Sequence, residues 1–505
     1  MNPGLLFSFV IGYFILLLIV AWFTSRNANN ESFFIGNRNS NWMLVAFGMI
    51  GTSLSGVTFV SVPGGVSAEA FAYFQIVIGY LIGYFVIAFV LLPLYYKLNL
   101  TSIYNYLSTR LGFKSYKTGA SFFILSRTLG ATARLYLVVK ILQDAILSSY
   151  NIPFWITTLI ILAMILIYTY EGGVKTIVYT DTLQTSCMLA GLVICVIYIL
   201  KTMNLDFADS ITAMSDKGMT KIFFTNPAGK LFFVKQIIAG AFITITMTGM
   251  DQEMMQKNIS VKTLKGSQKN VVTLGFTMFA VILLFLFLGG LLYLYAYQLG
   301  GHVETSMVNG NEVSKFMIGT EDATADKLFP VIALRHMPPL VSVIFIIALI
   351  SALFPSADGA ITALTSSFCI DILGMKRRTD MDDTAKKKLR QRVHLVFAVI
   401  FLLFVMIFKW VDNPSMIGLI LKVAGYTYGP LLGLFTFGII TKRKVDDKMV
   451  PYVAITAPII CFIIDKYQRS LFGGFEIGLE LLVINGLLTF AGLWLVSKKQ
   501  SEAVQ

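Results

Sequence analysis

Long apolar runs recur along the whole chain, and they constrain its fold more than any other feature. A helix needs about 20 mostly apolar residues to cross the hydrocarbon core of a bilayer. Here, runs of that length are separated only by short polar segments. Charged residues make up 13% of the chain, whereas a soluble domain carries about 25%. The pattern predicts an all-α, multi-pass protein embedded in a lipid bilayer.

Hydropathy predicts about thirteen transmembrane helices, each bounded by polar or charged residues. Their approximate ranges are 5–24, 42–63, 71–96, 117–147, 153–170, 176–200, 231–254, 271–299, 338–365, 393–411, 415–440, 449–465 and 477–497. The chain has a net charge of +13, but its basic residues lie in the short loops between the apolar runs. Positive charge in such loops reflects the orientation of the protein in the membrane and does not indicate a nucleic-acid partner.

Every second loop is basic, and this alternation predicts the orientation in the cell membrane (plasma or inner membrane). The basic loops contain Arg26 and Arg38, then Lys97 and Arg110, then Lys257, Lys262, Lys265 and Lys269, then segment 376–392, segment 442–448, and finally Lys498 and Lys499. The longest intervening loop is acidic-leaning, around Glu312, Glu321, Asp322 and Asp326. The positive-inside rule therefore predicts an external N-terminus and a cytoplasmic C-terminus.

Three predicted spans contain glycine, hydroxyl or carboxylate residues that a lipid-facing helix avoids. Such residues either pack helices closely or mark broken helices that line a cavity. A carboxylate inside the membrane is costly unless it is paired, solvated or bound to an ion. The second span offers backbone carbonyls around Gly51–Leu54, the ninth offers Ala352 and Ser356, and the sixth offers Asp181. These are the oxygen ligands that a hard cation such as sodium requires.

Four segments together resemble the sodium/solute symporter family. They are Glu171-Gly-Gly-Val-Lys-Thr-Ile-Val-Tyr-Thr-Asp181-Thr-Leu-Gln184, Thr52-Ser-Leu-Ser-Gly-Val-Thr-Phe59, Ser351-Ala-Leu-Phe-Pro-Ser-Ala-Asp358 and Gly429-Pro-Leu-Leu-Gly-Leu-Phe435. The resemblance covers roughly residues 1–445. It implies a leucine-transporter-type fold in a single polytopic domain: a leading helix (5–24), two inverted five-helix repeats (42–200 and 231–440) and two trailing helices (449–497).

The resemblance also implies a sodium site. Sodium acts here as a coupling ion, held by the backbone carbonyls of Gly51, Leu54 and Ala352 and by the hydroxyl of Ser356. The family usually has a second hydroxyl residue at the position of Pro355, so this chain lacks one ligand. A second sodium site, known in some members, maps to Ser55, Thr58, Asp181 and Asp358. The carboxylate of Asp358 offers charge that compensates for the missing hydroxyl, and the alternative is an ion pair between Asp358 and Lys422.

The resemblance says less about the substrate. Sugar-transporting relatives use a glutamine, an asparagine and a lysine where this chain has Thr58, Thr244 and Met278, which argues against a hexose. Arg134 shares a helical stripe with Arg127 and matches the position where sialic-acid transporters hold the substrate carboxylate, which suits a guanidinium. The structural alternative is that these cations form ion pairs with neighbouring acids or extend to the membrane–water interface. The candidate substrate residues are Thr58, Gln75, Arg134, Thr244, Met247 and Lys422.

We therefore expect sodium-coupled symport of a small organic solute, more carboxylate-like than sugar-like, by alternating access. A proton-coupled or sodium-independent carrier is the first alternative, because Pro355 alters the usual site and Asp181 or Asp358 can carry a proton. A sugar symporter is a second. A channel is disfavoured because no ring of repeated filter residues is present. A membrane enzyme is disfavoured because no nucleophile–base pair or metal-ligand cluster is apparent.

Overall fold

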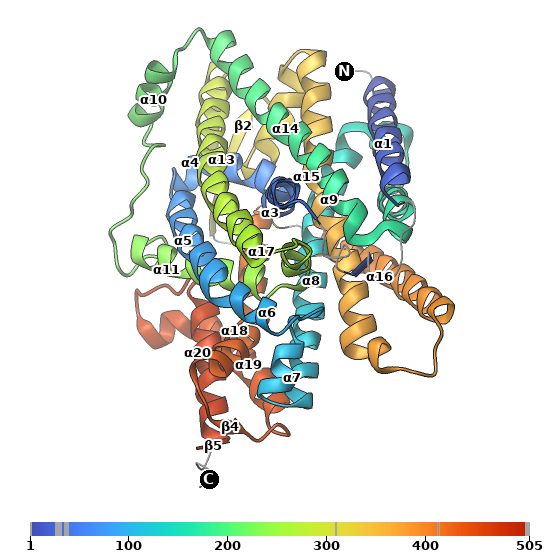
Figure 1. Cartoon of the computed structure of the whole chain (residues 1–505). Coiled ribbons are helices and arrows are strands. Elements are labelled where there is room, and N and C mark those ends of the chain that lie inside the picture. The colour runs from blue at the N-terminus through green and yellow to red at the C-terminus, as the bar shows by residue number, and fades with distance from the viewer. Residues whose placement is uncertain are drawn as a thin grey trace, which may run out of the picture.

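The computed structural model describes residues 3–25, 33–34, 40–308, 311–411, 413 and 415–499. It forms a helical bundle that is 80% helix (Figure 1), as the apolar runs predict. Arg26 and Arg38, which were counted among the basic loops, lie outside the described residues.

The helices of the first half of the chain are α1 (Pro3–Ser25), α3 (Trp42–Gly64), α4 (Val66–Glu69), α5 (Tyr73–Val86), α6 (Leu92–Lys97), α7 (Asn105–Arg110), α8 (Phe113–Leu142), α9 (Phe154–Met203), α10 (Phe207–Asp216), α11 (Phe233–Thr244) and α12 (Gln252–Ile259). Short π-helical turns extend α5, α8 and α11 at Ile87–Leu91, Gln143–Leu147 and Ile245–Gly249.

The second half comprises α13 (Leu264–Gln298), α14 (Leu328–Val331), α15 (Pro339–Ser367), α16 (Asp383–Val411), α17 (Met416–Thr427), α18 (Gly429–Ile440), α19 (Val450–Phe472) and α20 (Leu481–Leu495). Its strands are β1 (Gly301–Val308), β2 (Asn311–Ile318), β3 (Glu321–Asp322), β4 (Lys444–Val445) and β5 (Ser497–Lys498).

Among the described residues, nine helices are long and apolar enough to cross a bilayer, or up to eleven if each of two bent pairs forms one span. Two shorter apolar helices, Phe154–Tyr170 and Leu481–Leu495, lie in the remaining predicted regions. The multi-pass, all-α class is thus confirmed. The boundary predicted between 153–170 and 176–200 does not interrupt the backbone, because helical structure runs through it as α9.

Three spans are broken or bent. In α3, Ser55 has non-helical dihedral angles (φ 49°, ψ 162°), at the end of the segment where the sequence predicts freed carbonyls. The α11 span and α12 meet at 65°, and α17 and α18 meet at 47°. These two bends were not predicted. Asp251 explains the first, because its side chain caps α12 by accepting from the backbone N–H groups of Glu253 and Met254.

The long acidic-leaning loop contains an element that hydropathy did not predict. Strands β1 and β2 pair antiparallel, with Gly301 opposite Ile318, and β3 extends the sheet. A second small sheet joins β4 to β5. The start of α1 and strand β5 lie at opposite ends of the bundle, and β2 lies toward the end where α1 begins (Figure 1).

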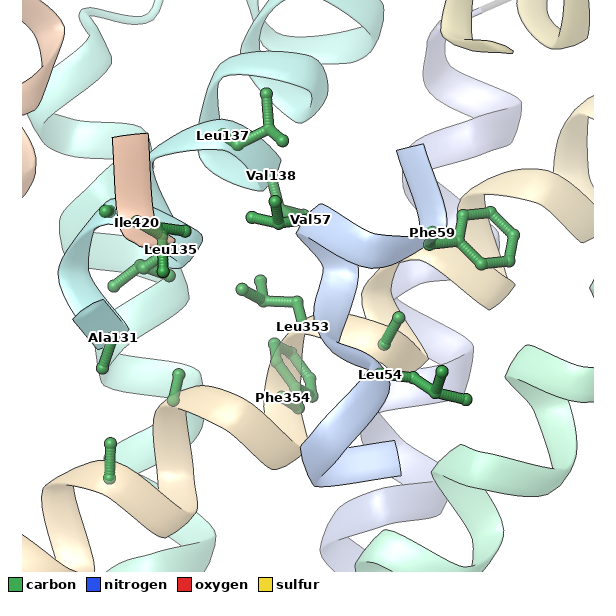
Figure 2. Packing of buried hydrophobic residues seen from close by; sticks show 14 of the residues in the cluster. Leu54, Val57, Phe59, Ala131, Leu135, Leu137, Val138, Leu353, Phe354 and Ile420 are labelled. Carbon is green, nitrogen blue, oxygen red and sulfur yellow. The ribbon is translucent and has the colours of Figure 1, made fainter. Parts of the chain in front are cut away.

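Broken helix α3 runs through the centre of the bundle, where it contacts α8, α9, α13 and α15. Its apolar side chains Leu54, Val57 and Phe59 are buried. Figure 2 shows Val57 beside Val138 of α8, with Leu353 of α15 lying between these helices. Apolar packing therefore fixes both sides of the α3 break.

Candidate functional site

The break in α3 lies against α15, which brings the predicted sodium ligands together. A Cβ built on Gly51 would lie 3.5 Å from the Cγ of Pro355, and one built on Gly56 would lie 3.7 Å from the Cα of Leu353. These are ordinary van der Waals distances, so α3 packs directly against α15 here, and the missing side chains instead make room for Thr185 of α9 at Gly51 and for Val138 of α8 at Gly56. Gly51 and Leu54 of α3 are thus held beside residues 352–356 of α15.

Both helices have weakened backbone hydrogen bonding at this point. The non-helical Ser55 interrupts the ladder of α3, and Pro355 has no N–H to donate to the carbonyl of Ser351. Ala352, Leu54 and Ser356 are all buried. The Ser356 hydroxyl donates to the carbonyl of Leu353 at 2.8 Å, so its lone pairs remain free to face a cation.

The hydroxyl of Thr185, which the sequence did not indicate as a ligand, also lies at the contact between α3 and α15. The Oγ1 of Thr185 in α9 would collide with a Cβ on Gly51, and the same Cβ position is the one next to Pro355. Thr185 is fully buried, and its hydroxyl has no hydrogen-bond partner among the described residues. A buried hydroxyl without a partner is costly and calls for an explanation.

The residues of the predicted second sodium site fall into three separate arrangements. The Ser55 and Thr58 hydroxyls lie 3.5 Å apart. The Asp358 carboxylate accepts from the Tyr168 hydroxyl at 2.7 Å. Asp181 instead pairs with Lys257, whose Nζ lies 2.7 Å from the Asp181 Oδ2.

Lys257 corrects the loop assignment made from charge alone. It was counted in a cytoplasmic basic loop, but its side chain is only 3% exposed. Besides Asp181, its Nζ donates to the Thr52 hydroxyl at 2.7 Å and lies 3.8 Å from the Glu253 Oε1. The bend between α11 and α12 explains the difference, because it turns α12 and this lysine back into the bundle.

The buried charges continue from Lys257 as a connected chain. Glu253 also forms an ion pair with Arg127, and a second guanidinium nitrogen of Arg127 lies 4.0 Å from the Asp251 carboxylate. Asp251 in turn accepts from the Tyr428 hydroxyl at 2.8 Å. Buried ions persist only when paired. These contacts therefore tie α12 to α8 and α9, and they tie the junction of α17 and α18 to the start of α12.

A cavity that is partly open to solvent lies beside the break in α3. Its mixture of apolar, aromatic and hydroxyl side chains is typical of a site for a small organic solute. Four of the predicted substrate residues line it, as do Met278 and a group of aromatic and hydroxyl side chains. These lining residues include Thr58, Arg134, Thr244, Met247, Met278, Ser53, Tyr73, Tyr80, Tyr84 and Thr248.

Arg127 and Arg134 share one face of α8 but have different surroundings. Arg127 forms ion pairs with Glu253 and Asp251, which is the structural alternative considered for an intramembrane arginine. Both arginines line the cavity, but within the described part of the chain no carboxylate forms an ion pair with Arg134. Among the described residues, this cation of the cavity wall has no acid partner of its own.

Two predicted substrate residues lie elsewhere. Gln75 is fully buried, and its amide bonds to the carbonyls of Ala72 and Leu231 and to the N–H of Phe224. Lys422 is 57% exposed and pairs with Asp465 at 2.8 Å. Gln75 is thus a structural cross-link between loop and helix, and Lys422 faces away from the cavity. The suggested Asp358–Lys422 ion pair is wrong for the same reason.

A family model for sodium:solute symporters matches residues 33–447, which is most of the chain. The chain belongs to the sodium:solute symporter family. The family resemblance based on the four sequence segments is thereby confirmed. The symporter is a sodium-coupled membrane transporter of small solutes, not an enzyme, and sodium is its coupling ion.

Relatives with described substrates are distant. A sodium/sialic acid symporter of Proteus mirabilis is 23% identical over 97% of this chain and 94% of its own length. The mouse sodium-coupled monocarboxylate transporter 1 is 23% identical over 81% of this chain and 64% of its own length. A solved structure of a Na⁺-coupled sialic acid symporter in a substrate-bound, outward-open state matches 98% of this chain with a TM-score of 0.80 at 19% identity. At that identity, the match shows a common fold.

Proposed function

We propose that the symporter takes up a small organic carboxylate together with sodium. Arg134 in the cavity wall, which has no ion-pair partner in the described part of the chain, carries this proposal, because a guanidinium binds a carboxylate through two parallel hydrogen bonds. In the membrane interior, a cation without a protein counter-ion favours an anionic ligand. The sialic acid and monocarboxylate substrates named for the distant relatives have this chemistry.

The surroundings of Arg134 favour an acid over a neutral hexose. Thr58, Thr244 and Met278 all line the cavity, so the positions that hydrogen-bond a sugar in sugar transporters offer two short hydroxyls and a thioether. The Tyr73 and Tyr80 hydroxyls, 3.3 Å apart, add polar groups on another wall. An acid with a polar, hydroxylated body fits this combination.

We propose that the coupling sodium binds between α3 and α15. Its ligands are the carbonyls of Gly51, Leu54 and Ala352, the Ser356 hydroxyl, and the Thr185 hydroxyl in place of the one missing at Pro355. Support comes from the contact of Thr185 with Gly51 beside Pro355. Ser55 and Thr58 of the same broken helix line the substrate cavity. Each ligand that favours one arrangement of α3 therefore aids the binding of the other.

The finer architecture belongs to the same proposal. We infer about thirteen spans with two inverted five-helix repeats (42–200 and 231–440) between a leading helix and two trailing helices (449–497). We also infer an external N-terminus and a cytoplasmic C-terminus in the plasma membrane. Supporting the orientation, Lys444 and Lys498 lie in the β4–β5 sheet at the end opposite the start of α1 (Figure 1).

Uptake and thermal stabilisation by candidate solutes test this function. The purified protein is screened with small carboxylates, amino acids and neutral sugars, each in sodium and in choline at equal ionic strength. We expect stabilisation by one or more carboxylates only in sodium, since a ligand at one hundred times its Kd adds about 2.7 kcal/mol. Stabilisation by neutral sugars and not by acids contradicts the proposal.

A pair of variants then assigns the response to Arg134. Arg134→Met removes the guanidinium from the cavity, and we expect it to abolish acid-dependent stabilisation and sodium-driven uptake. Lys422→Met is the matched control, because it removes a cation of the neighbouring helix α17 that pairs with Asp465 outside the cavity. An Arg134→Met variant with wild-type affinity for the acid overturns the assignment.

A further inference from the structure

The Asp181 carboxylate was expected to hold a second sodium ion, and in this structure a lysine ammonium lies against it. The Lys257 Nζ is 2.7 Å from the Asp181 Oδ2, 2.7 Å from the Thr52 hydroxyl and 3.8 Å from the Glu253 Oε1. Two carboxylates and a hydroxyl form the kind of oxygen set that surrounds a hard cation. The ammonium has the same single positive charge as a sodium ion.

The packing around Lys257 leaves it little freedom to withdraw. Lys257 and Asp181 are 3% and 0% exposed, so neither charge can turn to water. Gly359 of α15 makes room for the pair. A Cβ at this position would lie 3.3 Å from the Lys257 Nζ and would collide with the Glu253 carboxylate. The bend of 65° that sets α12 off from α11 directs the lysine into the bundle.

The remaining residues of the expected second sodium site have hydrogen-bond partners other than Asp181. Asp358 bonds to Tyr168, and Ser55 bonds to Thr58 beside the substrate cavity. A sodium ion bound at Asp181 would therefore meet a like charge at contact distance, which disfavours binding. The first sodium site is different, because its proposed ligands are neutral oxygens of α3, α15 and α9.

We propose that Lys257 is a tethered cation that takes the place of a second sodium ion, so that this symporter binds a single sodium ion in each transport cycle. The lysine neutralises Asp181 without a bound ion. Because α12 is one half of a bent span, the same ion pair fixes this half-helix against α9. The inference rests on the proposed sodium site between α3 and α15.

Counting bound sodium ions tests the proposal without a substrate. Equilibrium binding of radioactive sodium and the Hill coefficient of sodium-dependent thermal stabilisation are measured on the purified, full-length protein. We expect one ion for the wild type and two for Lys257→Met, in which Asp181 and Glu253 are left for a free cation. The double variant Lys257→Met with Asp181→Asn, which also removes the carboxylate, should return to one ion.

If Lys257→Met does not fold, adding Glu253→Gln removes one of the unbalanced buried charges and keeps Asp181 available, and two ions are again expected. Two ions bound by the wild type would overturn the inference while leaving the first sodium site intact. A folded Lys257 variant that still binds one ion would overturn it as well. Absence of sodium binding in the wild type would instead refute the site between α3 and α15, and the inference with it.

Discussion

Thr185→Val exchanges a hydroxyl for a methyl group at nearly constant volume, and we expect it to change stability and sodium affinity in opposite directions. The Thr185 hydroxyl is buried and has no hydrogen-bond partner in the described structure. Leaving such a group unsatisfied costs about 1–3 kcal/mol. In sodium-free buffer, the valine variant should therefore have a higher free energy of unfolding than the wild type, by about that amount.

The effect on sodium affinity follows from the lost ligand. A hydrogen bond to a charged group contributes about 1.5–3 kcal/mol, which we take as the scale for a hydroxyl ligand of a cation, and each 1.4 kcal/mol is a factor of about ten. We therefore expect the valine variant to need about 10- to 150-fold more sodium for half-maximal stabilisation. Thr185→Ser keeps the hydroxyl and should keep most of the affinity, so it separates loss of the ligand from a change in packing.

The assay is thermal unfolding of the purified protein across a sodium titration, with choline replacing sodium to hold ionic strength constant. The two expected shifts have different signs, so a general loss of folding cannot imitate them. A valine variant with the sodium midpoint of the wild type would refute the assignment of Thr185 as a ligand. A valine variant that is less stable without sodium would show that the hydroxyl has a structural partner instead.

Three further predictions concern stability. Arg127→Met leaves Glu253 buried without its guanidinium, and thermal or chemical unfolding should show a loss of about 3–5 kcal/mol. Lys422→Met breaks a more exposed ion pair, with Asp465, and should lose about 1 kcal/mol or less; equal effects of the two changes would contradict the buried-pair argument. Gly359→Ala should lose about 1–3 kcal/mol through collision with Glu253, whereas Gly130→Ala, with open space around it, should lose nothing; unfolding of both variants checks this. Burial raises the pKa of Asp326, in the loop before α14, to about 6. The folded state then holds this proton more tightly than the unfolded chain, so the free energy of unfolding should fall as pH rises from about 4 to about 6 and level off above. Asp326→Asn should flatten that part of the pH profile of the melting temperature, and an unchanged slope would contradict the assignment.

The sequence by itself determined the class, the family and the position of the central break. Apolar runs of membrane length and the small number of charges require a multi-pass helical bundle, because each is a local property that burial in lipid demands wherever the chain folds. The segment around Thr52 to Phe59 predicts a broken helix from its own glycines and hydroxyls, and Ser55 is non-helical in the structure. The two bends after Gly249 and Tyr428 were missed, although Asp251 is a recognisable helix cap.

Only the tertiary structure decided which distant side chains meet. The charge pattern predicts that Lys257 lies in a loop, because a lysine near the end of an apolar run is normally solvated, and the sequence does not reveal its buried partner. Its contact with Asp181 joins residues 76 positions apart, and no periodicity of either helix encodes that pairing. The same holds for Thr185 beside Gly51 and for the different environments of Arg127 and Arg134 on one face of α8. Burying a charge is costly, so buried charges such as Lys257 and Arg127 are paired, and the choice of partner depends on how the helices pack.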